Sequence, residues 1–153
     1  MKKPALDEAY TLPSETVAAF GENGHAFVPN LASAEEIAFY REAINEAADR
    51  YGQSPDTPLE SRDTYGKAFL QHMNLWEFDE TVAAFTLGPR FGQVAAELMG
   101  TPGVRLYHDQ ALFKEPGGGF TPWHQDQYYW PIDTDRTITM WMPLVDISEE
   151  MGM

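Results

Sequence analysis

The sequence contains no cysteine, so disulfide bonds, thiolate metal sites and cysteine nucleophiles are all excluded. Any metal ion would have to be bound by His, Asp or Glu side chains. Basic residues are scarce as well: 10 Lys and Arg stand against 24 Asp and Glu, which gives a formal net charge of -14. A field of this sign repels phosphate backbones and anionic membrane surfaces. We therefore expect no nucleic-acid partner and no membrane partner.

Long apolar runs are also missing. No stretch approaches the roughly 18 uninterrupted apolar residues of a membrane-spanning helix. The two lysines near the start are not followed by the apolar segment of a secretory signal, so we expect a soluble cytoplasmic protein. With 153 residues, 43% of them hydrophobic and 13% aromatic, the chain has the size and composition of one globular domain over residues 1–153.

The clearest local signal in the sequence is a capping box. Ser33 is followed three residues later by Glu36, the pattern in which each side chain caps the backbone N–H of the other residue. Apolar residues then recur at helical spacing over residues 37–51. The pattern predicts an amphipathic helix that stops at Gly52.

The rest of the first hundred residues favour further helices and short strands. The expected segments are a short helix from Ser14, as its cap, to Phe20, a strand-like run at 25–29, a loop at 53–63, an irregular strand at 67–76, and helices at 80–87 and 89–99.

After the last expected helix the pattern changes to that of strands. Residues 104–113 alternate so that Gln110 is predicted to point inward among apolar neighbours. Residues 137–145 alternate between an apolar face and a face that carries Thr139 and Trp141. Helices first and antiparallel strands after them are typical of an α+β fold, here a barrel or jelly roll with helices packed outside.

The candidate metal ligands are His124 and Asp126, which follow a glycine-rich loop at 116–120. In an extended segment, residues two apart point to the same face. Neutral imidazole and carboxylate are the ligands of ferrous iron in the 2-His-1-carboxylate site, which leaves its remaining positions open. A His-x-Asp pair is weak evidence by itself, because it recurs by chance and usually marks a surface or hydrogen-bonded histidine.

Three blocks of sequence, at residues 107–114, 123–130 and 139–144, closely resemble the phytanoyl-CoA dioxygenase family in order and spacing. The resemblance runs from about Phe27 to the end of the chain. It implies a double-stranded β-helix, the jelly-roll or cupin-like fold. It also implies an Fe(II)- and 2-oxoglutarate-dependent dioxygenase that hydroxylates a small-molecule substrate and releases succinate and CO₂, with ascorbate as a possible reductant.

Carried over by position, the resemblance gives roles to seven residues. His124 and Asp126 would be two iron ligands, and Gln110 and Trp141 would lie beside 2-oxoglutarate. The residues that would face the substrate are His108, Tyr128 and Trp130. For the tryptophans, the alternative is ordinary core packing. An aspartate in the ligand pair favours hydroxylation, because related halogenases have a small residue there that leaves room for chloride.

The resemblance also predicts two groups that the sequence lacks, the distal His ligand and the Arg that pairs with 2-oxoglutarate. The other histidines, His25, His72 and His108, all precede the pair. We therefore expect an N-terminal fragment of a longer oxygenase domain, inactive as it stands and with its barrel incomplete at the C-terminus. The remainder of the domain or a second chain would complete it. The alternative function is a non-catalytic cupin-like binding or structural module.

Overall fold

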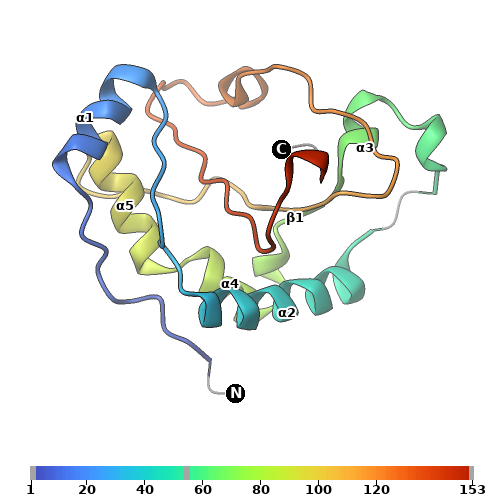
Figure 1. The fold of residues 1–153 in the computed structure, drawn as a ribbon, viewed down its shortest axis with the longest axis horizontal. Helices are drawn as coiled ribbons and strands as arrows, with labels where there is room; N and C mark the ends of the chain where they lie inside the picture. Colours follow the sequence, from blue (N-terminus) through green and yellow to red (C-terminus); the bar gives the residue numbers. More distant parts are fainter. Residues whose placement is uncertain (1–2, 54–55, 152–153) are drawn as a thin grey trace.

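The structure is a computed structural model that describes residues 3–53 and 56–151. Its α-helices are α1 (Ser14–Asn23), α2 (Ala34–Tyr51), α3 (Thr64–Ala68), α4 (Glu80–Thr86) and α5 (Pro89–Met99), and its strands are β1 (Leu70–Met73) and β2 (Gln110–Phe113). Short 3₁₀ helices are η1 (Leu59–Ser61), η2 (Leu75–Glu77), η3 (Asp126–Tyr129) and η4 (Glu149–Met151). In Figure 1 the first part of the segment after β2, drawn in orange, arches over the side opposite α2 and α4, and its last part, drawn in red, returns toward these helices. Met142 and Leu144 of that last part pack against the core.

Helix α2 confirms the capping-box prediction. Ser33 Oγ accepts a hydrogen bond from the Glu36 backbone N–H at 3.1 Å, and a Glu36 carboxylate oxygen accepts one from the Ser33 N–H at 2.7 Å. The helix ends at Gly52 as predicted. Its buried residues recur at helical spacing and pack against α4 and η2; they are Tyr40, Ile44, Ala47 and Ala48.

Helix α5 also has the predicted bounds. Pro89 occupies its first turn, where the missing N–H costs nothing. Gly100 ends it in the left-handed conformation, with φ 61°, which glycine adopts without steric penalty. Helix α4 begins after Asp79, whose carboxylate accepts hydrogen bonds from two backbone N–H groups of the first turn.

Several local predictions of secondary structure were wrong. Pro13, not Ser14, occupies the position before α1, so Ser14 is the first helical residue, and the helix continues past Phe20. Residues 25–29 form no strand. The irregular strand predicted at 67–76 is a strand only over β1, and its first two residues belong to helix α3. This helix begins where the Asp63 carboxylate accepts a hydrogen bond from the Gly66 N–H at 2.7 Å.

The core lies between α2, α4 and α5, with Tyr40 fully buried at its centre. The Tyr40 hydroxyl donates to the Pro4 carbonyl at 2.5 Å, which ties the N-terminal segment to α2. Arg90 of α5 pairs with Glu36 of α2 at 2.9 Å, and their side chains are only 10% and 13% exposed. Within the residues that the structure describes, no helix combines the length and apolar character needed to cross a bilayer.

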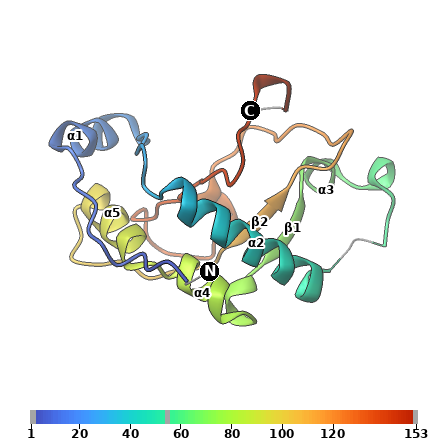
Figure 2. The same ribbon diagram turned by 60° about the horizontal axis from the view of Figure 1, so that its bottom comes forward.

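The strands pair antiparallel, with His72 opposite Ala111 and Met73 opposite Gln110. Figure 2 shows the two strands side by side next to α2. Ala111 and Phe113 face the helices, which leaves Gln110 exposed on the other face of the sheet. The prediction that Gln110 points inward was therefore wrong, because alternation defines two faces without saying which one the helices cover.

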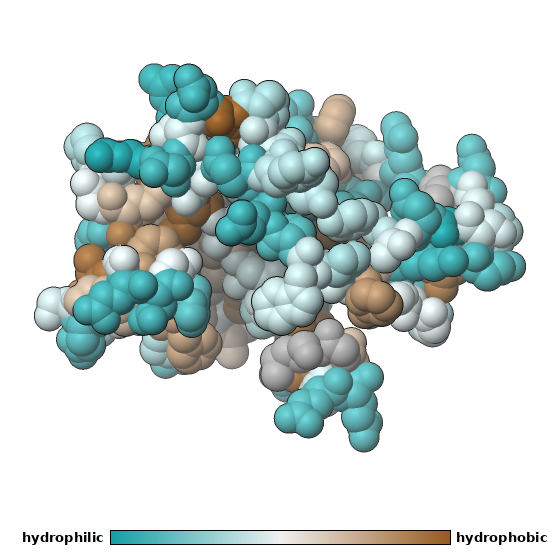
Figure 3. Space-filling view, turned by 90° about the horizontal axis from the view of Figure 1, so that it is seen from above, coloured by the Kyte–Doolittle hydropathy of each residue, from teal (hydrophilic) through white to brown (hydrophobic). Residues whose placement is uncertain are grey.

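The described residues have the α+β character that was expected, but they do not form a complete jelly roll. Their sheet has two strands, and the predicted strands at 104–113 and 137–145 are reduced to β2 alone. Seen from above, the molecule shows separate hydrophobic areas among hydrophilic ones (Figure 3). Large apolar side chains that are exposed after β2 include Phe120, Trp123, Tyr128 and Trp141.

Candidate metal centre

The loop that precedes His124 is held against helix α3. The Gly119 N–H donates to the Lys67 carbonyl at 2.7 Å. A Cβ on Gly118 would lie 2.9 Å from the Glu115 carbonyl oxygen and 3.0 Å from that of Lys67, and because real Cβ atoms are essentially never found closer than 3.0 Å, this approach favours glycine. Lys114 adds a hydrogen bond to the Ala68 carbonyl at 3.1 Å.

A second attachment of this loop is an ion pair. Arg62, just before α3, donates to the Glu115 carboxylate at 2.5 Å. The guanidinium also donates to the carbonyls of Thr57 and Gly66. The segment around α3 therefore acts as a platform that sets the path of the chain into His124 and Asp126.

His124 and Asp126 were predicted to lie in a strand, but Asp126 is the first residue of η3 and His124 lies in the irregular segment just before it. The backbone turns because the Tyr128 N–H donates to the Gln125 carbonyl at 3.1 Å. The two side chains nevertheless meet: His124 Nε2 lies 3.2 Å from Asp126 Oδ1, and the side chains are 31% and 39% exposed.

A backbone carbonyl fixes the orientation of the imidazole. His124 Nδ1 lies 2.8 Å from the Pro122 carbonyl oxygen, and because a carbonyl can only accept, Nδ1 must carry the proton. In the neutral ring, Nε2 then presents its lone pair to Asp126. A lone pair that faces a carboxylate is favourable only if a proton or a metal cation lies between the two atoms.

The Asp126 carboxylate is also oriented by a hydrogen bond. Thr139 Oγ1 donates to its Oδ2 at 2.6 Å, which leaves Oδ1 free to face His124. This role of Thr139 was not predicted from the sequence. The signal available was its position at the start of the third block of the resemblance.

The geometry of the pair fits one divalent cation. Nitrogen and oxygen ligands at about 2.1 Å from an ion, at a right angle to each other, are about 3 Å apart, close to the separation found here. Imidazole and carboxylate also suit ferrous iron. Among residues 3–53 and 56–151, no group of three or more His, Asp or Glu side chains could hold a metal ion, so the pair supplies two ligands.

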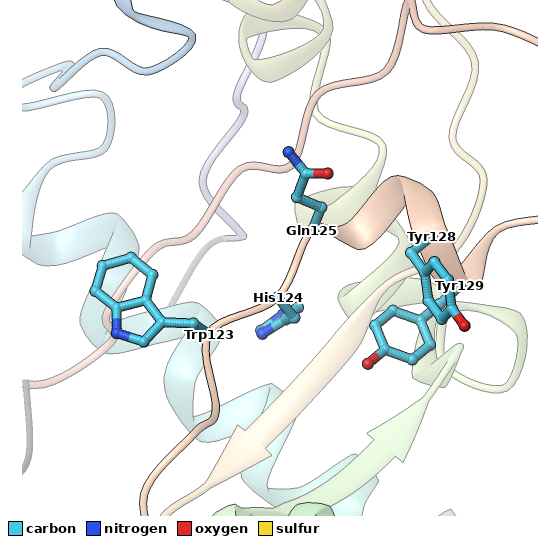
Figure 4. Close-up of a pocket in the computed structure, with 5 residues that line it drawn as sticks. All are labelled: Trp123, His124, Gln125, Tyr128 and Tyr129. Carbon is cyan, nitrogen blue, oxygen red and sulfur yellow. The ribbon is translucent and has the colours of Figure 1, made fainter.

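The pair lies beside an open hollow of about 470 Å³ that is lined by Trp123, His124, Gln125, Tyr128 and Tyr129. In Figure 4, Trp123 lies on one side of His124, and Tyr128 and Tyr129 lie together on the other side. Tyr65 of α3 reaches this cluster, and its hydroxyl lies 2.6 Å from that of Tyr129. Sequence reasoning missed Tyr65 and Tyr129, because a contact between distant segments has no local signal.

Residues 20–152 match the model of the family described as Phytanoyl-CoA dioxygenase (PhyH). The chain belongs to the phytanoyl-CoA dioxygenase family. No curated protein and no solved structure matches the chain. Membership confirms the family that the three sequence blocks indicated, and the match extends beyond the Phe27 limit expected from them. It implies an oxygenase-type enzyme and a cupin-like fold.

In this member of the phytanoyl-CoA dioxygenase family, the residues predicted to face the substrate lie in two separate groups. Tyr128 lines the hollow beside His124. His108 and Trp130 contact each other, with ring centroids 6.0 Å apart, and both contact Tyr107. Their roles remain predictions.

The residues predicted to bind 2-oxoglutarate do not reach the pair. The Gln110 amide donates instead to Gln71 and to the Met73 sulfur, and Trp141 is exposed. Within the part of the chain that the structure describes, no hydrogen bond joins Gln110 or Trp141 to His124 or Asp126. The cofactor role of these two residues also remains a prediction.

His25 and His72 have ordinary environments, as the sequence predicted. His25 is exposed, and its Nδ1 lies 3.1 Å from the Asn23 carbonyl oxygen. His72 is buried beside the Phe113 ring on the helix-facing side of the sheet. Neither takes part in the contacts of the candidate centre.

The ionised form of the Asp109 carboxyl, next to His108, is destabilised by burial. Burial raises the pKa of Asp109, and the nearby His108 only partly offsets the effect. Its Oδ1 atom is buried and has no hydrogen-bond partner among the described residues. Meanwhile the backbone of Asp109 is hydrogen-bonded to Asn74, which holds the carboxyl in this place.

Proposed function

We propose that this chain is part of a non-haem Fe(II)- and 2-oxoglutarate-dependent dioxygenase that hydroxylates a small-molecule substrate, and that His124 and Asp126 are two of its iron ligands. One observation carries the proposal. His124 Nδ1 donates a hydrogen bond to the Pro122 carbonyl, which leaves Nε2, 3.2 Å from Asp126 Oδ1, able to bind a divalent cation together with that carboxylate. Membership of the phytanoyl-CoA dioxygenase family supports it.

Bound Fe(II) with 2-oxoglutarate and O₂ would supply the oxidising power that replaces a substrate C–H bond by C–OH while 2-oxoglutarate becomes succinate and CO₂, with ascorbate as a possible reductant for the iron. The protein contributes orientation. Pro122 holds the imidazole and Thr139 holds the carboxylate, so neither ligand has to reorganise when the ion binds. Tyr128 offers an aromatic wall at the hollow beside the pair.

The proposal leaves a third ligand to be supplied. The chain has four histidines, and none of the other three lies in the contacts around His124 and Asp126. The missing ligand and a basic partner for 2-oxoglutarate would therefore come from a further part of the same domain or from a second chain. Gln110 and Trp141 are proposed to lie beside 2-oxoglutarate, and His108 and Trp130 beside the substrate, in that completed site.

A second candidate function is a cupin-like binding or structural module without catalysis. It is favoured by the finding that no set of three metal-binding side chains occurs among the described residues. The two functions differ in one measurable property: the oxygenase needs a divalent cation at His124 and Asp126, and the module does not.

Titration with Mn(II), a redox-stable substitute for Fe(II), tests the proposal by the loss of the free-ion electron paramagnetic resonance signal. We expect the chain to bind one Mn(II), and His124→Ala and Asp126→Ala to abolish that binding. His25→Ala is the matched control, because it removes an exposed imidazole elsewhere and should bind as the parent does. Equal Mn(II) binding by the parent and by His124→Ala would reject the iron site and favour the module.

A further inference from the structure

A pair of tyrosines joins helix α3 to the segment that carries the candidate ligands. Tyr65 belongs to α3 and Tyr129 is the last residue of η3. Their hydroxyl oxygens lie 2.6 Å apart, so one phenol donates to the other. Their rings meet edge to face, with centroids 6.0 Å apart.

Both phenol rings also contact the imidazole of His124. The Tyr65 and His124 centroids are 6.2 Å apart at 78°, and those of Tyr129 and His124 are 6.1 Å apart at 69°. The three rings thus form one edge-to-face cluster, a geometry that aromatic rings prefer. The phenols contact the ring itself, whereas Pro122 contacts only its Nδ1 atom.

The other attachments of this segment to the α3 platform lie earlier in the chain. Gly119 bonds to Lys67, and Glu115 bonds to Arg62. These contacts set the path of the backbone ahead of His124 but do not touch its ring, which is held at Nδ1 by the Pro122 carbonyl and at its edges by the two phenol rings. The torsion about the Cβ–Cγ bond of histidine is broad and roughly two-fold in proteins, so a half-turn of the ring would break the Pro122 hydrogen bond and move Nε2 away from Asp126.

We propose that Tyr65, through its hydrogen bond to Tyr129, is a positioning residue that holds the His124 imidazole with Nε2 toward Asp126. The inference rests on the proposed function, since it is the metal that requires this orientation. Groups that orient a metal-binding histidine typically change metal affinity by about 10- to 100-fold when they are removed. Neither phenol touches the metal in this assignment; both act through His124.

The first experiment compares Tyr65→Phe, Tyr129→Phe and the double variant in the Mn(II) titration, with thermal unfolding by circular dichroism. Tyr51→Phe is the matched control, because Tyr51 is a partly exposed tyrosine of α2 that stacks on Phe78. We expect Tyr65→Phe and Tyr129→Phe each to weaken Mn(II) binding by about tenfold at an unchanged unfolding temperature. The double variant should be no weaker than either single one, since all three lose the same hydrogen bond.

The second experiment needs no metal. Nuclear Overhauser contacts between the His124 ring protons and the two tyrosine rings report the orientation of the imidazole in the metal-free chain. We expect these contacts in the parent and in Tyr51→Phe, and their loss or averaging in Tyr65→Phe.

The two readouts separate this inference from the proposed function. If Tyr65→Phe retains both the ring contacts and the parent's Mn(II) affinity while His124→Ala loses binding, the positioning role is overturned and the iron site stands. If the ring contacts depend on Tyr65 but the parent binds no Mn(II), Tyr65 does position His124 and the proposed iron site fails.

Discussion

His124 Nε2 lies 3.2 Å from Asp126 Oδ1, while His124 Nδ1 is occupied by the carbonyl of Pro122. Two groups that both accept hydrogen bonds are thereby held face to face at the surface of the protein. Such an arrangement is stable only with a positive charge between them, supplied by a proton or by a metal ion. The contact was reached without the strand that the spacing predicted, through a turn into a 3₁₀ helix.

Replacement of Thr139 by Val should weaken metal binding. The Thr139 hydroxyl donates to Asp126 Oδ2 at 2.6 Å, and Val keeps the shape of the side chain without the donor. We expect about a tenfold loss of Mn(II) affinity, measured by calorimetric titration. Thr139→Ser retains the hydroxyl and should bind nearly as the parent does. An unchanged affinity in Thr139→Val would show that Asp126 needs no support.

Replacement of Gly118 by Ala should loosen the loop that leads to His124. The new Cβ would lie 2.9 Å from the Glu115 carbonyl oxygen and 3.0 Å from that of Lys67, and neither backbone group can move cheaply. We expect a loss of about 1–3 kcal/mol in the free energy of unfolding, measured with urea. Gly103→Ala is the control, because nothing lies within 4 Å of its added Cβ. Equal stability of the two variants would contradict the close packing of the loop on α3.

Replacement of Glu36 by Gln should destabilise the chain at neutral pH. Burial alone would raise the pKa of Glu36, but the hydrogen bonds from Arg90 and the Ser33 backbone outweigh it and lower the pKa. The ionised group therefore adds stability above its ordinary pKa of 4.5, and this stability is lost as the pH falls through the lower value of the folded state.

We expect Glu36→Gln to cost about 1–3 kcal/mol in urea unfolding at pH 7. The cost should shrink steadily in acid. Glu35→Gln, in the same helical turn but exposed, is the control and should change little. A cost for Glu36→Gln that does not depend on pH would rule out the ion pair as its cause.

Replacement of Asp109 by Asn should stabilise the chain at neutral pH. The raised pKa of Asp109 means that the folded state favours the protonated carboxyl. The protonated carboxyl thus contributes stability that is greatest at pH values below the ordinary pKa of 3.8 and is lost as the pH rises through the folded-state pKa. At pH 7 the ionised carboxylate is thus a cost, and the neutral amide should stabilise the fold by about 1 kcal/mol.

Urea unfolding between pH 4 and pH 7 measures this difference. Asp109→Asn should gain relative to the parent as the pH rises. Asp133→Asn, at an exposed turn residue, is the matched control and should follow the parent across the range. A less stable Asp109→Asn protein at pH 7 would mean that the carboxylate has a favourable partner.

The elements that the sequence predicted well are those whose signals are local. The Ser33 and Glu36 capping box located α2, and Pro89 and Gly100 located α5. Each of these signals acts within one turn of helix, where neighbouring residues alone decide the hydrogen bonds. Strands depend on partners elsewhere in the chain. The pattern at 104–113 therefore yielded a strand only over Gln110–Phe113, where β1 lies alongside.

In the candidate site, too, the local contact was predicted and the contacts between distant segments were not. The spacing of His124 and Asp126 was enough to predict that their side chains meet, although the predicted backbone conformation was wrong. The partners that orient them, Thr139 and Tyr65, come from other segments and could not be found from local pattern. The family resemblance predicted His124 and Asp126 as ligands but gave no indication of the contacts that hold their side chains in place.

The platform built around α3 has a consequence for how the site comes into being. The contacts of Tyr65 with Tyr129 and of Arg62 with Glu115 join residues 64 and 53 positions apart in the chain. Closing loops of this length costs entropy that only the packed core can repay, so these contacts form with the whole fold rather than ahead of it. We therefore expect the final orientation of the His124 ring to be reached late in folding, so its appearance in a refolding experiment would mark the arrival of the native state.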